Sequence, residues 1–299
     1  MAFFIVTDAC SDLPGHYIAQ QKDLIVVPML YQADQDEQLL DLTDPACPQK
    51  THAFFEKMRA GASTRTSQIN QAIWEERLRP LLADGHDVLV LAFSGGLSST
   101  AQSAHLACEA LREQYQGRKI MAVDSLCASM GEGLFVHVVL KYRDEGHDID
   151  ACRDYAENIR QSIMHWFTVE DLVYLKRGGR ISAASYFAAT VLNIKPVLNV
   201  DPKGHLVSRN KVQGRKRSLR ALYENVVKYA DHPERQTMFI GHGDCLEDAE
   251  WLAKRLKEEL HVPEIMIGYI GPVIGAHSGP GTLAVFFVDP TGAGRLEAE

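Results

Sequence analysis

Two glycine-rich segments, far apart in the sequence, carry basic side chains that could meet a negative charge. The first, Gly271–Gly281, holds His277 near its middle and directly precedes the apolar run Leu283–Val288. The second, Tyr174–Ser182, reads Tyr-Leu-Lys-Arg-Gly-Gly-Arg-Ile-Ser and includes Arg180. Glycine allows backbone conformations that other residues avoid, so N–H groups in such turns can converge on one point. Either segment alone could be a tight connection, but together they indicate a binding site for an anion.

Two further segments supply hydroxyl groups in front of predicted helices. Ser94–Thr100 follows an apolar run and offers more hydroxyls than helix capping needs, and Ser63–Gln68 is the second such cluster. The start of a helix presents unpaired N–H groups and the positive end of the helix dipole, which favours an anionic oxygen. Asp8, Asp124 and Ser125 also follow predicted strands, and we expect these three to be ordinary caps.

A serine hydrolase acting on acyl esters or small molecules is the alternative that these residues leave open. Ser94 and Ser98 lie between a strand and a helix, which is a suitable place for a nucleophile, and His277 or His242 could be its base. However, no G-x-S-x-G pattern surrounds either serine. The P-loop spacing G-x-x-x-x-G-K-[ST] is absent as well.

A run of cations without any intervening acid extends from residue 209 to residue 220. Its members are Arg209, Lys211, Arg215, Lys216, Arg217 and Arg220. The run is either a solvated turn and helix face or a docking surface for an acidic partner or a nucleotide. The chain as a whole has a formal net charge of −8, which disfavours nucleic acid as a partner.

The composition is that of a globular protein, with 46% apolar and 23% charged residues in a chain of 299. No apolar run reaches the roughly 18 residues that span a bilayer, and the first residues read as a strand rather than a signal peptide. We therefore expect no stable membrane insertion. Six scattered cysteines without a C-x-x-C pair favour free thiols in a reducing compartment and argue against a zinc site. These features predict a cytoplasmic protein without a metal.

The elements that must position these residues alternate in the first half of the chain. Strands are predicted over 3–6, 24–30, 88–93 and 120–123, and helices over 73–82, 101–114 and 131–143. Such alternation is typical of βαβ units with a parallel sheet, and ligands bind at the carboxyl edge of such sheets. The hydroxyls of Ser94–Thr100 are expected at that edge.

The second half has a mixed pattern. Helices are predicted over 170–176, 183–192, 219–229 and 247–259, and strands over 194–200, 205–211, 237–240, 265–269 and 283–288. The strands on either side of Asp201–Gly204 are expected to form an antiparallel hairpin. The predicted fold class is α/β with two domains: a parallel, Rossmann-like domain over 1–160 and a mixed α/β domain over 161–289. A disordered tail is predicted over 290–299.

Taken in order, the motifs resemble those of the DegV family over nearly the whole chain, from residue 3 to about residue 288. They are Thr7-Asp8 with Ser11–Pro14, Thr66–Gln68, Ser94–Thr100 with Gln102–Ala104, Val123–Ser125, Tyr174–Ser182, Asn193–Pro196 and Gly275–Gly281. The resemblance implies one long-chain fatty acid held in a tunnel between two α/β domains, with no cofactor. It also implies that the protein presents this acid to a separate ATP-binding kinase subunit, which yields acyl phosphate, and that it has no turnover alone.

The resemblance assigns roles to individual residues. Thr66 and Ser98 resemble the hydroxyls that hold the fatty-acid carboxylate, and Arg180 and His277 resemble the basic pair that completes the network and assists phosphoryl transfer. The basic positions that resemble the docking surface for the kinase are Arg209, Arg215, Lys216 and Arg217.

The chain departs from the family pattern at four positions. Ile69 stands where proline is usual, Ser99 replaces a glycine, Ala101 a tyrosine and Ala9 a serine. None of these changes removes a proposed ligand. Ser99 leaves open whether it or Ser98 provides the second hydroxyl to the carboxylate.

Overall fold

A four-stranded parallel sheet forms the first half of the molecule in this computed structural model, which describes residues 3–181 and 193–295. The helix predicted over 183–192 lies outside the described residues. In the order β2-β1-β6-β7, the strands are β1 (Phe3–Asp8), β2 (Leu24–Val27), β6 (Asp87–Ala92) and β7 (Ile120–Asp124). The predicted parallel sheet and the α/β class are therefore confirmed.

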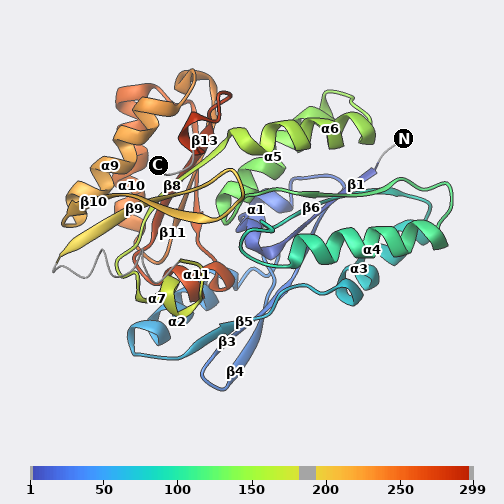
Figure 1. The fold of residues 1–299 in the computed structure, drawn as a ribbon, viewed down its shortest axis with the longest axis horizontal. Helices are drawn as coiled ribbons and strands as arrows, with labels where there is room; N and C mark the ends of the chain where they lie inside the picture. The colour runs from blue at the N-terminus through green and yellow to red at the C-terminus, as the bar shows by residue number, and fades with distance from the viewer. Residues whose placement is uncertain (1–2, 182–192, 296–299) are drawn as a thin grey trace.

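Helices cover both faces of this sheet (Figure 1). On one face lie α3 (Gln71–Ala83) and α4 (Thr100–Gln114), and on the other lie α5 (Met130–Asp144) and α6 (Ile149–Ile159). A parallel sheet buried on both faces needs strands that are nearly continuous apolar runs. This requirement explains why the strands were predictable from the sequence.

Pro28 divides the single strand predicted over 24–30. The chain leaves the parallel sheet at Val27 and enters a small antiparallel sheet of order β4-β3-β5, made of β3 (Met29–Ala33), β4 (Asp36–Leu40) and β5 (Thr64–Thr66). Proline lacks the N–H that a strand ladder needs. Sequence reasoning did not predict this sheet, because β4 begins with the polar residues Asp-Glu-Gln. It also did not predict the helix α2 (Cys47–Arg59).

The second half forms a six-stranded mixed sheet with the order β10-β9-β8-β13-β11-β12. Its strands are β8 (Ile163–Thr168), β9 (Ile194–Val200), β10 (Leu206–Gln213), β11 (Thr237–His242), β12 (Glu264–Tyr269) and β13 (Leu283–Val288). The predicted hairpin is confirmed, because β9 and β10 pair antiparallel. Two helices, α9 (Arg215–Tyr229) and α10 (Leu246–Leu260), pack on one face.

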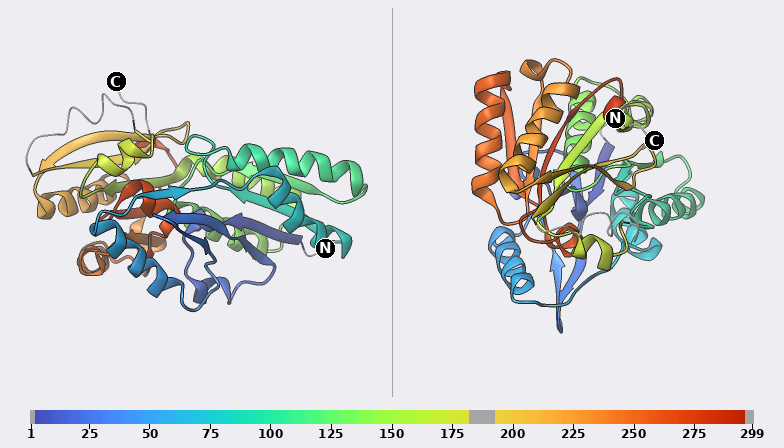
Figure 2. Two further views of the ribbon diagram at one scale, coloured as in Figure 1. Left: turned by 90° about the horizontal axis from the view of Figure 1, so that it is seen from below. Right: turned by 60° about the vertical axis from the view of Figure 1, so that its left-hand side comes forward.

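The helix α5 lies between the two larger sheets. Its residues are buried almost without interruption from Met130 to Leu140, and it contacts β8, β11 and β13 as well as the turn after β1. Most of these buried residues are apolar, which suits a helix in the interior, and Glu132 and His137 are the polar exceptions. Figure 2 shows the two sheets along the long axis, with α9, α10, β9 and β10 toward one end. The domain boundary near residue 160 remains a prediction.

The glycine-rich segment Gly271–Gly281 is not a simple turn. Pro272–Ser278 forms the helix α11, with proline at its first turn, and the chain leaves it through Gly279, whose φ is +85°. Proline is favoured at a helix start because its missing N–H would be unpaired there anyway. The helix lies against α7 (Val173–Arg177), part of the other glycine-rich segment.

The predicted disordered tail is wrong for residues 290–295. Ala293–Arg295 forms a 3₁₀ turn in which Gly294 and Arg295 are buried. The Nε of Arg295 donates to the carbonyl of Ile163 at 2.9 Å, so the segment is fixed to β8. The prediction of disorder rested on composition, which does not record these contacts or the hydrogen bond from Asn199 to the carbonyl of Gly294. No helix in the described residues is long and apolar enough to cross a membrane.

Candidate anion-binding cavity

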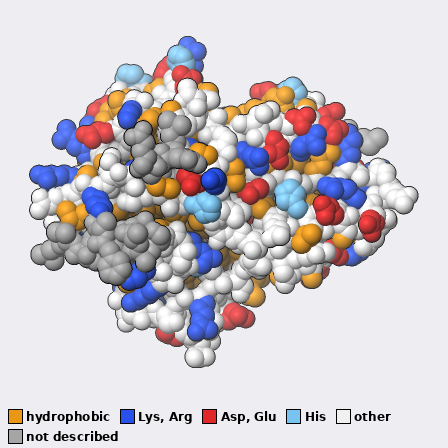
Figure 3. Space-filling model, viewed as in Figure 1, with side chains coloured by type: hydrophobic (Ala, Val, Ile, Leu, Met, Phe, Trp, Pro, Cys, Tyr) orange, Lys and Arg blue, Asp and Glu red, His pale blue; other side chains and the backbone are white. Residues whose placement is uncertain are grey.

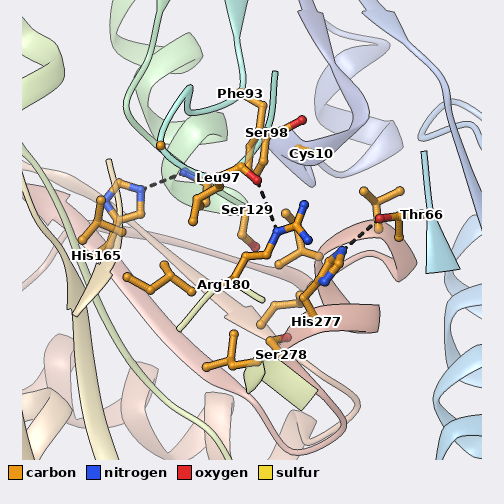
Figure 4. A pocket seen from close by; sticks show the side chains of 18 of the residues that line it. Cys10, Thr66, Phe93, Leu97, Ser98, Ser129, His165, Arg180, His277 and Ser278 are labelled. Atoms are coloured by element: carbon orange, nitrogen blue, oxygen red, sulfur yellow. Dashed lines mark hydrogen bonds between the residues drawn. The ribbon is translucent and has the colours of Figure 1, made fainter. Parts of the chain in front are cut away.

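A cavity of about 550 Å³ lies where the carboxyl edge of the parallel sheet meets the six-stranded sheet. Its walls combine polar residues with apolar ones, and the apolar residues include Phe93, Phe167, Ile270, Val273 and Phe286. Thr66, Ser98, Ser99, Arg180 and His277, all of which were candidate site residues, also line it. Figure 4 shows Thr66, Ser98, Arg180 and His277 on one side and His165 on the opposite side. The cavity thus combines a polar cluster with an apolar interior.

Thr66 and His277 contact each other in the wall of the cavity. The Oγ1 of Thr66 lies 2.9 Å from the Nε2 of His277. Thr66 ends the short strand β5, and His277 occupies the last turn of α11, which contacts both β5 and β3. The two predicted groups therefore belong to one hydrogen-bonded unit, as Figure 4 shows.

His277 is held in its neutral form. Burial, and to a smaller extent the charge of Arg180, lower the pKa of His277 from 6.5 to about 4. Its Nδ1 is buried and has no hydrogen-bond partner among the described residues. An anion placed beside this ring would favour the imidazolium and raise its pKa again.

Arg180 brings a permanent positive charge to the cavity. Its Nε donates to the carbonyl of Leu97 at 3.2 Å, and its Nη1 donates to the carbonyl of Gly178. Within the described parts of the chain, no carboxylate comes within ion-pair distance of the guanidinium. Carbonyl oxygens orient a guanidinium without neutralising it, so the charge remains available for an anion.

Ser98 and Ser99 stand at the start of α4. The Oγ of Ser98 lies 2.9 Å from the Oγ1 of Thr100 and accepts from the Thr100 N–H at 3.3 Å, whereas Ser99 is exposed. Both serines line the cavity, so the choice between them stays a prediction. The positive end of α4 adds to the attraction for an anion.

The contacts of the serines and histidines do not assemble a hydrolase pair. Ser94 donates to the carbonyl of Gly204 at 2.9 Å, and Ser98 bonds with Thr100. His277 bonds with Thr66, and His242 is not among the residues that line the cavity. Neither serine hydrogen-bonds to a histidine within residues 3–181 and 193–295. The arrangement therefore suits an anion better than a nucleophile and its base.

Asp8 caps the 3₁₀ turn Ala9–Ser11, as predicted, but Asp124 and Ser125 do not cap a helix, because the N-cap of α5 is Ser129. Ser125 Oγ accepts from the N–H of Cys127 within the loop. Asp8 Oδ1 accepts from the N–H of Cys10 and its Oδ2 from the N–H of Phe93, and Asp124 Oδ1 accepts from the N–H groups of Gly95 and Leu126. Burial raises the pKa of Asp8 to about 6. These bonds fix the loops after β1, β6 and β7, which form the rim of the cavity.

Sequence reasoning missed several buried polar groups behind the cavity. Asp12 accepts from Ser129 at 2.6 Å, and burial raises the pKa of Asp12 to about 8. On the far wall, His165 Nε2 accepts from the N–H of Ala128 at 3.1 Å, and burial lowers its pKa well below 6.5. The sequence spacing did not single out Asp12 or His165, although Asp12 lies within the family motif Ser11–Pro14.

The basic run separates into half-buried and exposed members. Arg215 binds Asp248 through its Nε at 2.8 Å and its Nη2 at 2.7 Å, with 22% of its side chain exposed. Arg209 is half-buried and donates to Asn199 at 2.8 Å. Lys216 and Arg217 are exposed. Figure 3 shows Lys and Arg side chains along the edge where β10 and α9 lie. Through its ion pair with Asp248, Arg215 joins α9 to α10, and its expected role in docking stays a prediction.

Comparison with known proteins places the chain among similar sequences and folds. A model of the DegV family, whose members are described as uncharacterised, matches residues 2–289. A DegV domain-containing protein of Clostridium perfringens is 38% identical over 289 residues, which cover 97% of this chain and 98% of the relative.

Two solved structures share the fold. The first, from Thermus thermophilus and described as a DegV family protein with fatty acid binding, has a TM-score of 0.84 and 29% identity, with 97% of this chain and 100% of that chain covered. The second is the Fatty Acid Kinase (Fak) B3 protein of Streptococcus pneumoniae, solved with linoleic acid. It has a TM-score of 0.82 and 20% identity, and the match covers 97% of this chain and 100% of that chain.

Proposed function

The chain belongs to the DegV family, and we propose that it binds one long-chain fatty acid and presents the carboxylate to a separate kinase subunit. The single observation that carries this proposal is the composition of the cavity. Arg180, His277, Thr66 and Ser98 gather beside apolar walls in one space of about 550 Å³. That volume is within the usual 300–1,000 Å³ of small-molecule sites.

The polar cluster meets the requirements of a buried carboxylate. Removing a charged group from water is costly unless it is paired and hydrogen-bonded. Arg180 supplies the opposite charge, and Thr66, His277 and Ser98 or Ser99 supply donors. The described fatty acid binding of the Thermus thermophilus relative supports this ligand class.

The apolar walls provide the driving force for the acyl chain. Each buried CH₂ contributes about 0.8 kcal/mol, so a chain of about 16 carbons offers on the order of 12 kcal/mol before ordering costs. The ligand would lie between the two larger sheets, which supports a division into an N-terminal and a C-terminal domain. In this proposal the protein has no cofactor and no turnover of its own.

When the carboxylate is presented to a kinase, a second anion, ATP, must come close to it. Fixed cations near the reacting oxygens stabilise the developing charge of phosphoryl transfer. Arg180 and His277 are the groups positioned for this role. The docking surface for the kinase consists of Arg209, Arg215, Lys216 and Arg217, of which Lys216 and Arg217 are the more exposed. The name of the Streptococcus pneumoniae protein with this fold agrees with a kinase-associated role.

Organic extraction of purified protein followed by mass analysis tests the binding step. We expect about one fatty acid per chain, and a lipid-free protein that also fails to bind added fatty acid would refute the proposal. With a cognate kinase and ATP, Arg180→Ala and His277→Ala should reduce acyl-phosphate formation while lipid is partly retained. If both single variants form acyl phosphate at the wild-type rate, neither Arg180 nor His277 assists phosphoryl transfer.

A further inference from the structure

Gly178 lies between the two basic groups of the cavity, and we propose that it is a positioning residue that holds the His277 ring beside Arg180. The inference deepens the proposed function and rests on it. Gly178 ends α7, and the helix α11 that carries His277 lies against α7. The two glycine-rich segments thus meet at this residue.

The space next to Gly178 is filled by the imidazole of His277. A Cβ atom on residue 178 would come closer than 3.0 Å to His277 Nδ1, a separation that Cβ atoms essentially never show, and would lie 3.2 Å from Cγ and 3.3 Å from Cε1. The other side of the ring is bonded to Thr66 through Nε2. The ring therefore cannot move away from a new side chain without disturbing the Thr66 contact.

The backbone of Gly178 does not itself require glycine. Its φ of −70° and ψ of −12° lie in the right-handed helical region, which every L-residue adopts. Its neighbour Gly179 is the opposite case: its φ is +70°, yet a Cβ there would meet nothing within 4 Å. Gly178 is thus needed for space and Gly179 for conformation.

Gly178 also contacts Arg180. Its carbonyl accepts a hydrogen bond from Arg180 Nη1, while its Cα faces the Nδ1 of His277. One residue therefore fixes the guanidinium through its carbonyl and the imidazole through its missing side chain. A displaced ring would leave the position in which it and Arg180 can both face one carboxylate.

The two adjacent glycines provide a matched pair of variants. Gly178→Ala should still fold but lose some stability, because the added methyl displaces the His277 ring from its contact with Thr66. Its fatty-acid affinity should fall about tenfold or more. Gly179→Ala should lower stability through strain at positive φ and keep affinity within about twofold. Wild-type affinity in Gly178→Ala would overturn the proposal.

A measurement on ligand-free protein separates this inference from the proposed function. In ¹⁵N NMR titrations, Gly178→Ala should move the His277 midpoint upward from about 4, because the ring leaves its buried place beside Arg180. Gly179→Ala should leave it unchanged. An unmoved midpoint in Gly178→Ala would overturn the positioning role. If the midpoint moves but wild-type protein binds no fatty acid, the proposed function fails and the positioning role stands.

A double variant guards against a nonspecific effect of Gly178→Ala. In a His277→Ala background the added methyl at residue 178 meets no imidazole, so it should weaken fatty-acid binding no further. A further loss equal to that seen in the wild-type background would show that Gly178 acts independently of His277, which would also overturn the proposal.

Discussion

Thr66 Oγ1 and His277 Nε2 lie 2.9 Å apart, although 211 positions separate the two residues in the chain. The strand β5 that carries Thr66 belongs to a small antiparallel sheet, and the helix α11 that carries His277 packs on that sheet. The polar cluster of the cavity therefore forms only when β5 and α11 have packed together. A hydroxyl bonded to a neutral imidazole can orient both groups toward one anion.

Removing the Thr66 hydroxyl should weaken fatty-acid binding. Thr66→Val keeps the β-branched shape but frees His277 Nε2, and we expect about a tenfold loss of affinity, since hydrogen bonds to charged groups contribute about 1.5–3 kcal/mol. Thr64→Val is the matched control, because Thr64 lies on the same strand and its Oγ1 bonds to the Ala276 carbonyl at 3.3 Å. Equal losses in both variants, measured by fluorescent fatty-acid displacement, would contradict the prediction.

Fatty-acid binding should raise the pKa of His277 from its value of about 4. The carboxylate favours the charged imidazole, so binding takes up a proton and affinity should increase as the pH falls from about 8 to about 5. His242 is the internal control, because burial lowers its pKa to about 4 and it does not line the cavity. NMR titration with and without ligand distinguishes them, and a shift of similar size in both histidines would argue against a carboxylate at His277.

Ser98→Ala and Ser99→Ala should separate the two candidate hydroxyls. We expect Ser98→Ala to weaken retention of fatty acid and also to reduce stability by about 1 kcal/mol, because its Oγ accepts from the Thr100 N–H at a helix start. Ser99 is exposed and makes no capping bond, so Ser99→Ala should leave stability unchanged. Fatty-acid binding isotherms of the two variants, measured on protein shown to be folded, decide which serine contacts the carboxylate.

A fluorophosphonate probe adds a test of the hydrolase alternative to the serine variants. Wild-type protein should remain unlabelled at both Ser94 and Ser98, since neither hydroxyl bonds to a histidine in the described residues. Stoichiometric labelling at either serine would favour an enzyme.

Charge reversal on α9 should affect docking without affecting the lipid. Lys216→Glu with Arg217→Glu changes two exposed side chains, so lipid content and stability should stay near wild type while kinase-dependent activity falls. The loss should be largest at low salt, where the wild-type attraction is strongest. If the charge-reversed variant has wild-type activity at every salt concentration, Lys216 and Arg217 have no docking role and are only part of a solvated helix face.

Arg215 serves as the contrasting position within the same run. Its two bonds to Asp248 join α9 to α10. Arg215→Ala should therefore lower the free energy of unfolding by about 1–2 kcal/mol. Unchanged stability would mean that this ion pair contributes little.

The parts of the fold that the sequence predicts are those with a clear local pattern. β1, β6 and β13 are continuous apolar runs, and the β9–β10 hairpin surrounds a proline- and glycine-containing turn, so their identity follows from the residues alone. The strand β4 is polar at its start, and the short helix α11 is rich in glycine, so tertiary contacts rather than propensity decide both.

The candidate site was predictable in its residue types but not in its contacts. Thr66, Ser98, Arg180 and His277 were singled out by motif, and all four line one cavity. The pairing of Arg215 with Asp248 depends on how two helices pack, which no spacing within the chain records.

Arg295 should prove essential to the stability of the C-terminal segment. It is 1% exposed, its Nε donates to the Ile163 carbonyl, and its Nη2 lies 3.4 Å from the Sγ of Cys127. Arg295→Ala should cost about 2–4 kcal/mol through the cavity it leaves. Arg295→Met should cost less, because it fills the space, removes a buried charge, and leaves the Ile163 carbonyl bonded to His165 Nδ1 at 2.9 Å. Urea unfolding measures both variants. If Arg295→Ala is as stable as wild type, the contacts of this side chain contribute nothing to the stability of the fold.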